Sequence, residues 1–202
     1  MSALNERSML TGEIVQFRTK IMRNVFKLAE FHTGTERVER QSDAFSWSDD
    51  KGKVRISAFN FKLYFSEFSF EYWHVIEEEE KVLQTDHKAA LIKQAKTMNV
   101  QLRFLSIDTL HADPNRTRNQ LLGHHYLAGL FLADLGPTVK NARLLVTKNG
   151  SIRPIDISRK HGTSSSHAIG ACLRLWRAGE VQQENESDVV GSHWRVRVPN
   201  EK

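Results

Sequence analysis

The densest group of side chains that could do chemistry is the acidic run Glu77–Glu80, which is followed by Lys81. Clustered carboxylates are the ligands that hard divalent cations prefer. Glu79 and Lys81 are two residues apart, and side chains at that spacing share one face of a strand. A run of this kind also suits the solvated start of a helix, where negative charge is favourable. We therefore expect an exposed turn or helix start here rather than a metal site.

Histidines and aromatic residues form a second group of candidates. His124 and His125 fall early in a predicted helix, where adjacent side chains point apart, so we expect a surface position and no shared metal. The aromatic residues of 59–73 could stack on unpaired bases. Their alternation favours the core of a sheet instead, with His74 either in that core or on the strand surface.

Hydroxyl groups and cations near the C-terminal end could contact DNA or a partner protein, because such groups bind phosphates and base edges. These candidates are Lys160, Ser164, Ser165, Ser166, His167, Arg174 and Arg177. Three acids in the following loop, Glu184, Glu186 and Asp188, would repel a phosphate backbone. Gly170 and Ala171, which we expect on the exposed face of the same helix, are poor at reading bases. The sequence leaves DNA contact and protein contact open.

The pattern of residues 137–198 predicts a winged helix-turn-helix. An amphipathic segment, Thr138–Val146, is followed by a short helix from Pro154 that stops at Gly162. A longer helix follows the serine-rich turn, and its apolar residues recur at i, i+3, i+4 and i+7. Two β-like runs, Glu180–Gln183 and His193–Val198, flank the polar loop. Three helices followed by a β-hairpin are typical of small nucleic-acid or protein docking modules.

The elements that precede this module alternate between helix and strand. The expected elements are a helix over 13–31, a short strand Phe45–Trp47, strands over 53–65 and 68–77, a helix capped by Thr85 or Asp86 and ended by Asn99, a strand Val100–Ile107, and a helix from Asp113 to about Leu135. The order α-β-β-β-α-β-α predicts an α/β domain with a mixed sheet flanked by helices.

Composition sets broad limits on the function. The net charge of +5 is compatible with polyanion binding. A lone cysteine, Cys172, lies on the predicted apolar helix face, which argues against a disulfide framework and fits a reducing cytoplasm. The polar start, Met1–Arg7, is unlike a signal peptide. No apolar run approaches the roughly 20 residues of a membrane span, so we expect a cytoplasmic protein without membrane contact.

The order of elements and several short sequences resemble the TnsA-type endonuclease subunits of heteromeric cut-and-paste transposases. Leu28–Phe31 through Arg40-Gln41 is similar to the family's "LLEFDP…V…QP", and the hairpin 53–77 stands where the family has "PDF…EVK". Leu105–Ile107 with Asn119–Leu122 is similar to its "vvTe…N…LL". The resemblance spans residues 13 to 198. It implies a restriction-endonuclease-like, PD-(D/E)xK fold with a C-terminal winged helix that binds DNA, the partner transposase and an ATPase regulator.

The resemblance also implies a metal site, and the sequence departs from it. Active family members hold Mg or Mn on carboxylates, beside a lysine that orients water. The family's aspartate falls on Asn60, and the second acid and the lysine fall on Glu77 and Glu79. An amide is a much poorer ligand for a hard dication than a carboxylate. We therefore interpret Asn60, Glu77 and Glu79 as degenerate catalytic positions and expect no cofactor and no cleavage.

These observations predict two domains, a degenerate nuclease-like domain over 1–135 and a winged helix-turn-helix over 136–202. The favoured function is a catalytically degenerate, TnsA-like transposition subunit that binds DNA, transposase partners, or both. One alternative is an active metal-dependent transposon-end endonuclease with other ligands, such as Glu30, Glu77 and Glu79. Another is a winged-helix DNA-binding regulator whose front domain forms a homodimer.

Overall fold

The computed structural model describes residues 4–77, 84–185 and 187–199. Contacts divide the chain into two compact units. The first unit comprises the described residues of 1–6, 16–30 and 35–112, and the second those of 7–15, 31–34 and 113–202. The helix that follows Asp113 therefore packs in the second unit, whereas the sequence pattern places the boundary after residue 135. Within the described ranges, no helix is both long and apolar enough to cross a membrane.

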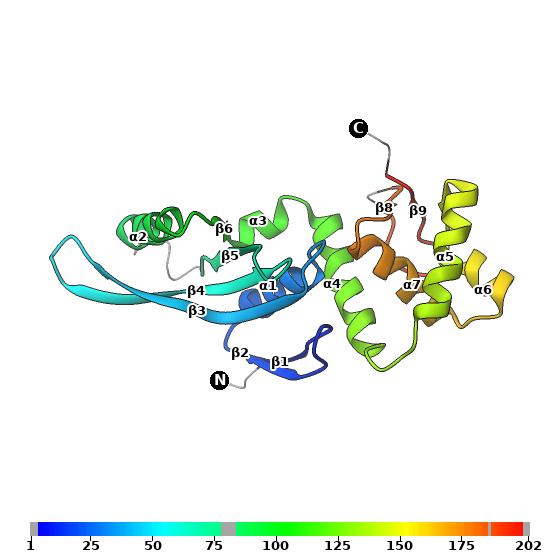
Figure 1. Cartoon of the computed structure of the whole chain (residues 1–202), viewed down its shortest axis with the longest axis horizontal. Helices are drawn as coiled ribbons and strands as arrows, with labels where there is room; N and C mark the ends of the chain where they lie inside the picture. Colours follow the sequence, from blue (N-terminus) through cyan, green and yellow to red (C-terminus); the bar gives the residue numbers. More distant parts are fainter. Residues whose placement is uncertain (1–3, 78–83, 186, 200–202) are drawn as a thin grey trace. The chain divides into compact units, whose positions relative to one another are not determined.

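A four-stranded mixed sheet is the centre of the first unit (Figure 1). The elements are α1 (Lys20–Phe31), β3 (Arg37–Ser48), β4 (Val54–Tyr64), β5 (Phe70–Val75), α2 (Gln84–Thr97), β6 (Gln101–Leu105) and α3 (Ile107–His111). The strand order is β3-β4-β5-β6, with β5 and β6 parallel and the other pairs antiparallel. A parallel pair needs a crossover, and α2 supplies it. The α/β class with helices flanking a mixed sheet is confirmed.

Helices α1 and α2 of this unit contact different aromatic residues of β4. The ring of Phe61 lies 6.2 Å from that of Phe26 on α1, whereas Phe59 stacks on Tyr72 and shares a cluster with Leu91 of α2. Residues two apart in a regular strand share one face, so in a regular β4 Phe59 and Phe61 would contact the same helix. The ribbon is irregular here, because the pairing of β3 with β4 shifts register between Ser42 and Phe45. The expectation that these aromatics form sheet core is confirmed, since Phe59, Phe61 and Tyr72 are fully buried.

Two expectations about the first unit are wrong. Residues 13–31 do not form one helix: Ile14–Phe17 is strand β2, which pairs with β1 (Leu4–Arg7), and the helix begins at Lys20. Ile14 and Phe17 are three residues apart, which matches the helical period, but in β2 they fall on opposite faces, with Ile14 exposed and Phe17 buried. The pairing of β2 with β1 is a tertiary contact that this spacing does not reveal. The short strand at Phe45–Trp47 is in fact the end of β3, which starts at Arg37. The polar start of this edge strand carries no hydrophobic alternation.

The second unit consists of four helices and a small sheet. Its elements are α4 (Pro114–Gly129), α5 (Gly136–Asn149), β7 (Ser151–Ile152), α6 (Pro154–His161), α7 (Ser165–Arg177), β8 (Gln182–Gln183) and β9 (Val196–Arg197). The strands follow the order β7-β9-β8 and are antiparallel. The strands predicted over 180–183 and 193–198 are thus shorter than expected. Helix α4 ends at Gly129 and not near Leu135, which is a buried residue just before α5.

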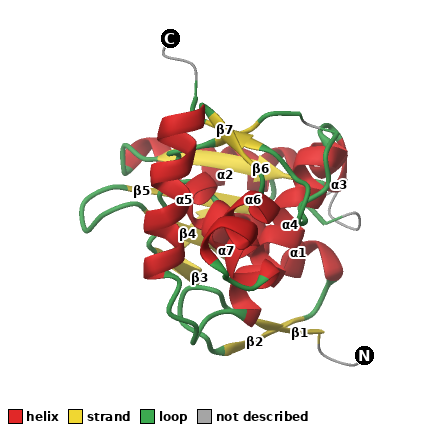
Figure 2. Cartoon of the chain, turned by 90° about the vertical axis from the view of Figure 1, so that its right-hand side faces the viewer, coloured by secondary structure: helices red, strands yellow, loops and turns green. Residues whose placement is uncertain are grey.

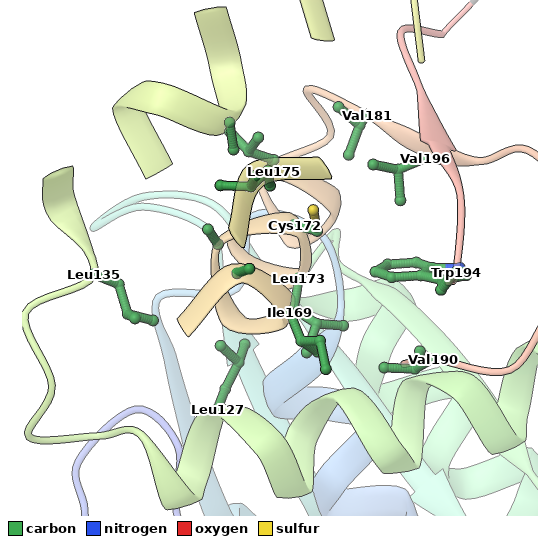
Figure 3. Close-up of a cluster of buried hydrophobic side chains, with 14 of the residues drawn as sticks. Leu127, Leu135, Ile169, Cys172, Leu173, Leu175, Val181, Val190, Trp194 and Val196 are labelled. Atoms are coloured by element: carbon green, nitrogen blue, oxygen red, sulfur yellow. The ribbon is translucent and has the colours of Figure 1, made fainter. Parts of the chain in front are cut away.

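Helix α7 is the centre of the second core. It contacts α4, α5 and α6, as Figure 2 shows in end-on view. Its residues Ile169, Cys172 and Leu173 pack in one cluster with Trp194 and Val196 from the chain that follows it (Figure 3). Cys172 is fully buried, as the sequence predicts, and this burial raises the pKa of its thiol to about 12.

Candidate functional site

Asn60, the first predicted catalytic position, takes part in the sheet itself. Its side-chain Oδ1 accepts a hydrogen bond of 2.7 Å from the backbone N–H of Val75 on β5. The pairing of β4 with β5 runs from Tyr64↔Phe70 to Phe61↔Trp73 and stops there. The amide oxygen of Asn60 therefore replaces a backbone carbonyl where the two strands separate. Its chemistry is that of a structural acceptor.

Glu77, the second predicted position, also has a hydrogen-bond partner. Its Oε1 accepts a hydrogen bond of 2.6 Å from Thr19 Oγ1. The same hydroxyl oxygen accepts a long bond of 3.4 Å from the N–H of Met22 in the first turn of α1. Glu77 follows Val75, the last residue of β5, by two residues, whereas Asn60 lies within β4 and is bonded to Val75. Glu79 lies outside the described residues.

A third carboxylate, Glu71 on β5, was missed by sequence reasoning. It is 3% exposed, and both of its oxygens are occupied. Trp73 Nε1 donates to Oε1 at 2.6 Å, and Arg103 Nε on β6 donates to Oε2 at 3.2 Å. An acidic residue inside a strand of aromatic residues was the signal available. Among the described residues, no group of three or more His, Cys, Asp or Glu side chains could hold a metal ion.

Titratable groups of three strands meet at another place on the sheet. Tyr72 O–H donates to Asp43 Oδ2 at 2.5 Å, and Lys62 Nζ lies 3.1 Å from the same oxygen. Burial and then the Asp43 carboxylate raise the pKa of Tyr72. The ammonium group of Lys62 also lies 4.1 Å from the ring centre of Phe70. The cluster keeps Tyr72 protonated and ties β3, β4 and β5 together.

A polar network fixes α2 on the β3–β4 ribbon. Trp47 Nε1 donates to Ser57 Oγ at 3.0 Å, and Ser57 Oγ lies 2.8 Å from His87 Nε2. Since the indole already donates to Oγ, the Ser57 hydroxyl can donate its own hydrogen to the ring nitrogen. The rings of Trp47 and His87 stack with centres 5.5 Å apart.

His74 lies in the core beside this network. It is 6% exposed, its ring centre is 5.4 Å from that of His87, and its Nδ1 has no hydrogen-bond partner in the described part of the chain. Burial, followed by the neighbouring His87, lowers the pKa of His74 to about 4. His74 is therefore neutral at physiological pH.

The second unit brings together part of the predicted binding set. Lys160 is exposed in the last turn of α6, and Gly162 with φ of 66° turns the chain toward α7. Ser164 caps α7 by accepting from the N–H of His167 at 3.2 Å. Ser165 and Ser166 are exposed in the first turn, and His167 is half-buried. These residues form one polar surface, which we name the α6–α7 junction (residues 159–167).

Arg174 and Arg177 are separated from this junction. The intervening residues 168–173 are all buried, whereas Arg174 is exposed. Arg177 is half-buried, and its carbonyl accepts a long bond of 3.4 Å from the N–H of Gly34. The buried residues 168–173 thus interrupt the exposed members of the predicted set along α7.

Two expectations about exposure are wrong. Gly170 and Ala171 do not lie on an exposed helix face; both are buried. A Cβ on Gly170 would come 2.7 Å from Leu130 Cδ1, so the segment that precedes α5 covers this side of α7. His124 is fully buried, while His125 is exposed. Their opposite directions follow from helical geometry, but the sequence did not show that one of the two would be buried.

The polar loop between β8 and β9 is held against α4. Asn119 of α4 is fully buried. Its Nδ2 donates to the carbonyl of Asp188 at 2.6 Å and to Gln183 Oε1 at 3.2 Å, and its Oδ1 accepts from the N–H of Val190 at 3.2 Å. One asparagine therefore connects both ends of the loop to the helix.

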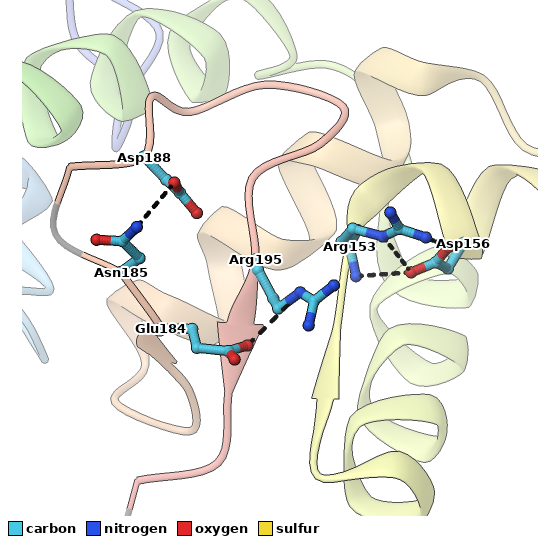
Figure 4. Close-up of polar contacts among 6 residues, drawn as sticks. All are labelled: Arg153, Asp156, Glu184, Asn185, Asp188 and Arg195. Atoms are coloured by element: carbon cyan, nitrogen blue, oxygen red, sulfur yellow. Dashed lines mark hydrogen bonds and ion pairs between the residues drawn. The ribbon is translucent and has the colours of Figure 1, made fainter.

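The acids of this loop have partners of their own, as Figure 4 shows. Glu184 lies 3.7 Å from Arg195 Nε, and Asp188 Oδ1 accepts from Asn185 Nδ2 at 3.3 Å. Arg153 nearby pairs with Asp156 at 2.8 Å. Glu186 lies outside the described residues. Because the described acids are engaged with neighbours in the loop or the small sheet, they do not extend as a free negative arm.

Comparison with known proteins adds no identification. No protein-family model matches the chain, and no curated protein matches it. The resemblance to TnsA-type endonucleases therefore stays a prediction.

Proposed function

We propose that this protein is a DNA-docking subunit of the TnsA type that has kept a nuclease-like sheet without its cleavage chemistry. The observation that carries the proposal is the α6–α7 junction. Arg159, Lys160 and His161 are exposed at the end of α6, and the serines of the α7 first turn are exposed directly after them. From Ile157 to Gly179 the sequence contains no acidic residue.

This combination suits a phosphate backbone. The side chains of lysine and arginine neutralise phosphates, and the free N–H groups at the start of a helix donate hydrogen bonds to an anion. In helix-turn-helix proteins, the first turn of the second helix contacts the DNA. The order of helices and strands in the second unit supports a winged helix, with α6 and α7 in the positions of the two helix-turn-helix helices.

The burial of α7 limits what this module can read. Residues 168–173 are covered by neighbouring helices, so only the first turn and Arg174 remain for DNA. Small hydroxyl groups and flexible cationic side chains mainly contact DNA phosphates, which positions the protein on the DNA backbone but does not distinguish one base from another. We therefore expect salt-dependent binding with weak sequence preference.

The first unit supports the second half of the proposal. Helix α1, the antiparallel β3-β4-β5 strands, the α2 crossover and the parallel strand β6 follow the order of a restriction-endonuclease-like core. At the positions that the family uses for catalysis, Asn60 completes the sheet and Glu77 binds the start of α1. The sheet then serves as a platform for DNA or for a partner transposase.

A salt titration of DNA binding tests the docking proposal. Full-length protein is titrated into a labelled duplex of random sequence at several salt concentrations. Lys160→Glu should weaken binding by about tenfold or more at low salt and lower the salt slope. Lys148→Glu is the matched control, because Lys148 is exposed in the last turn of α5 and carries the same charge change. Equal losses in both variants, or no binding by the native chain, would contradict the proposal.

A further inference from the structure

A groove in the first unit is separate from every residue used above for DNA. It has a volume of about 700 Å³. One wall consists of residues 45–50, at the end of β3 and the start of the following turn. The other wall is one side of α2, formed by Asp86, Ala89, Ala90, Lys93, Gln94 and Thr97. Figure 1 shows α2 alongside the outer part of the β3–β4 ribbon.

The β3 wall is a strand edge and not a strand face. Four consecutive residues, 45 to 48, line the groove, although neighbours in a strand point to opposite faces. Their partners on β4, residues 54 to 57, do not line it. In the described sheet β3 is the first strand of the order β3-β4-β5-β6. Its outer backbone groups therefore face the groove, and a strand edge of this kind is a template for another strand.

The helical wall leaves room beside that edge. Ala89 and Ala90 are small, and Ala89 is exposed. The groove is thus a strand edge opposite a helix, with a gap in which the side chains of an added strand could lie. This is the arrangement in which extended peptides bind by extending a sheet. Phe45 and Trp47 supply apolar surface beside the same edge.

The charge of the groove is opposite to that of the whole chain. The described residues that line it include three acids, Asp49, Asp50 and Asp86, and one cation, Lys93. The whole chain, in contrast, carries a net charge of +5. Asp49 is paired with Arg55 at 3.0 Å, whereas Asp50 and Asp86 are exposed. An occupant that pairs with these carboxylates must be basic, which excludes nucleic acid.

We propose that this groove binds an extended, basic segment of a partner protein, which pairs with β3 as an added antiparallel or parallel strand. Apolar side chains of the segment lie against Trp47 and Ala89, and its lysine or arginine side chains meet Asp50 and Asp86. The β3–α2 groove is therefore a protein-docking surface, while the α6–α7 junction is the DNA-docking surface.

Panning of a random peptide library, with peptides of about ten residues, tests this proposal. Full-length protein is the bait, and the variant Ala89→Trp, which fills the groove, is the counter-bait. We expect enrichment of peptides that alternate basic and apolar residues. A synthetic peptide of the enriched sequence should slow amide hydrogen exchange at alternate residues of 45–48. It should bind Ala89→Trp at least about tenfold more weakly.

Matched variants separate this outcome from others. Lys96→Trp places the same ring on an exposed position of α2 that does not line the groove, and it should bind normally. Asp50→Lys with Asp86→Lys should weaken binding about tenfold, while Asp108→Lys on α3 should not. The circular dichroism of each variant shows whether α2 is folded, and the charge variants test the groove without filling it.

Three results would overturn the proposal: no enrichment over the counter-bait, enrichment of acidic peptides, or binding that the groove variants leave unchanged. Self-association that Ala89→Trp abolishes would assign the groove to a second copy of the chain and also overturn it. None of these results depends on DNA binding, so failure here is distinguishable from failure of the α6–α7 junction.

Discussion

The two units differ in what their polar side chains do at the positions where the sequence suggests chemistry. In the first unit, Asn60 and Glu77 are hydrogen-bonded to the strand and the helix that surround them. In the second unit, Lys160, Ser165 and Ser166 are exposed at the α6–α7 junction. A side chain that completes the fold is not free for catalysis, whereas an exposed one can meet a ligand. This difference is the basis for our proposal that the chain docks on DNA and does not cleave it.

The largest expected effect concerns Asn119, a buried polar residue with a structural role that does not belong to the α6–α7 junction. Asn119→Ala leaves the buried N–H of Val190 without its acceptor and removes one of the two donors to the Asp188 carbonyl, so we expect a loss of about 3 kcal/mol in the free energy of unfolding. Urea denaturation measures the loss. His125→Ala, on the same helix but exposed, should change stability by less than about 0.5 kcal/mol. A loss below about 1 kcal/mol for Asn119→Ala would show that the loop is not held by this residue.

The next effect is the acid sensitivity that His74 gives to the first unit. Its pKa is about 4 in the folded chain and 6.5 when exposed. Below pH 6.5 the unfolded chain binds a proton that the folded chain does not, so stability falls as the pH drops from 6.5 toward 4. The two pKa values correspond to roughly 3 kcal/mol over that window.

His74→Phe is the variant that isolates this effect, because a phenyl ring fits beside His87 and Phe104 and does not titrate. Unfolding midpoints measured between pH 7 and pH 4 should decline less steeply in the variant. Parallel curves would show that His74 is not buried in its neutral form.

A smaller effect separates a structural from a catalytic role for Asn60. Asn60→Ala leaves the Val75 N–H without its acceptor and should cost about 1–2 kcal/mol. Asn60→Asp retains an acceptor oxygen, so its free energy of unfolding should stay within about 0.5 kcal/mol of the native chain. Thermal and urea unfolding check both variants. If Asn60→Ala is as stable as the native chain, the Asn60 side chain does not stabilise the sheet.

The parts of the fold that follow from local patterns were predictable from the sequence. The β4–β5 hairpin, the α2 crossover and the caps at Asp113 and Ser164 all rest on residues that are close in the chain. The edge strand β3 was predicted only at Phe45–Trp47. Its earlier residues, from Arg37 on, are largely exposed and polar, so they show no alternation of apolar and polar residues. The helix expected over 13–31 was wrong at its start, because the spacing of Ile14 and Phe17 is helical while the pairing of β2 with β1 sets the conformation there.

The candidate site was less predictable, since it depends on contacts between distant segments. The bond from Val75 to Asn60 and the ties from Asn119 to the 183–190 segment join residues far apart in the chain. The burial of Gly170 depends on Leu130 and Leu135, which approach α7 only after the second unit has folded. The sequence drew attention to Asn60 and Glu77, but only the structure shows which atoms these two side chains bind.

The most direct test of docking without cleavage is a single incubation that reports both. Supercoiled plasmid is mixed with enough full-length protein to shift all of it in a gel at low salt, in buffer containing Mg²⁺ or Mn²⁺, and is then stripped of protein. The account predicts a complete shift and plasmid that remains supercoiled. Nicked plasmid that disappears with Asn60→Ala or Glu77→Ala would contradict it.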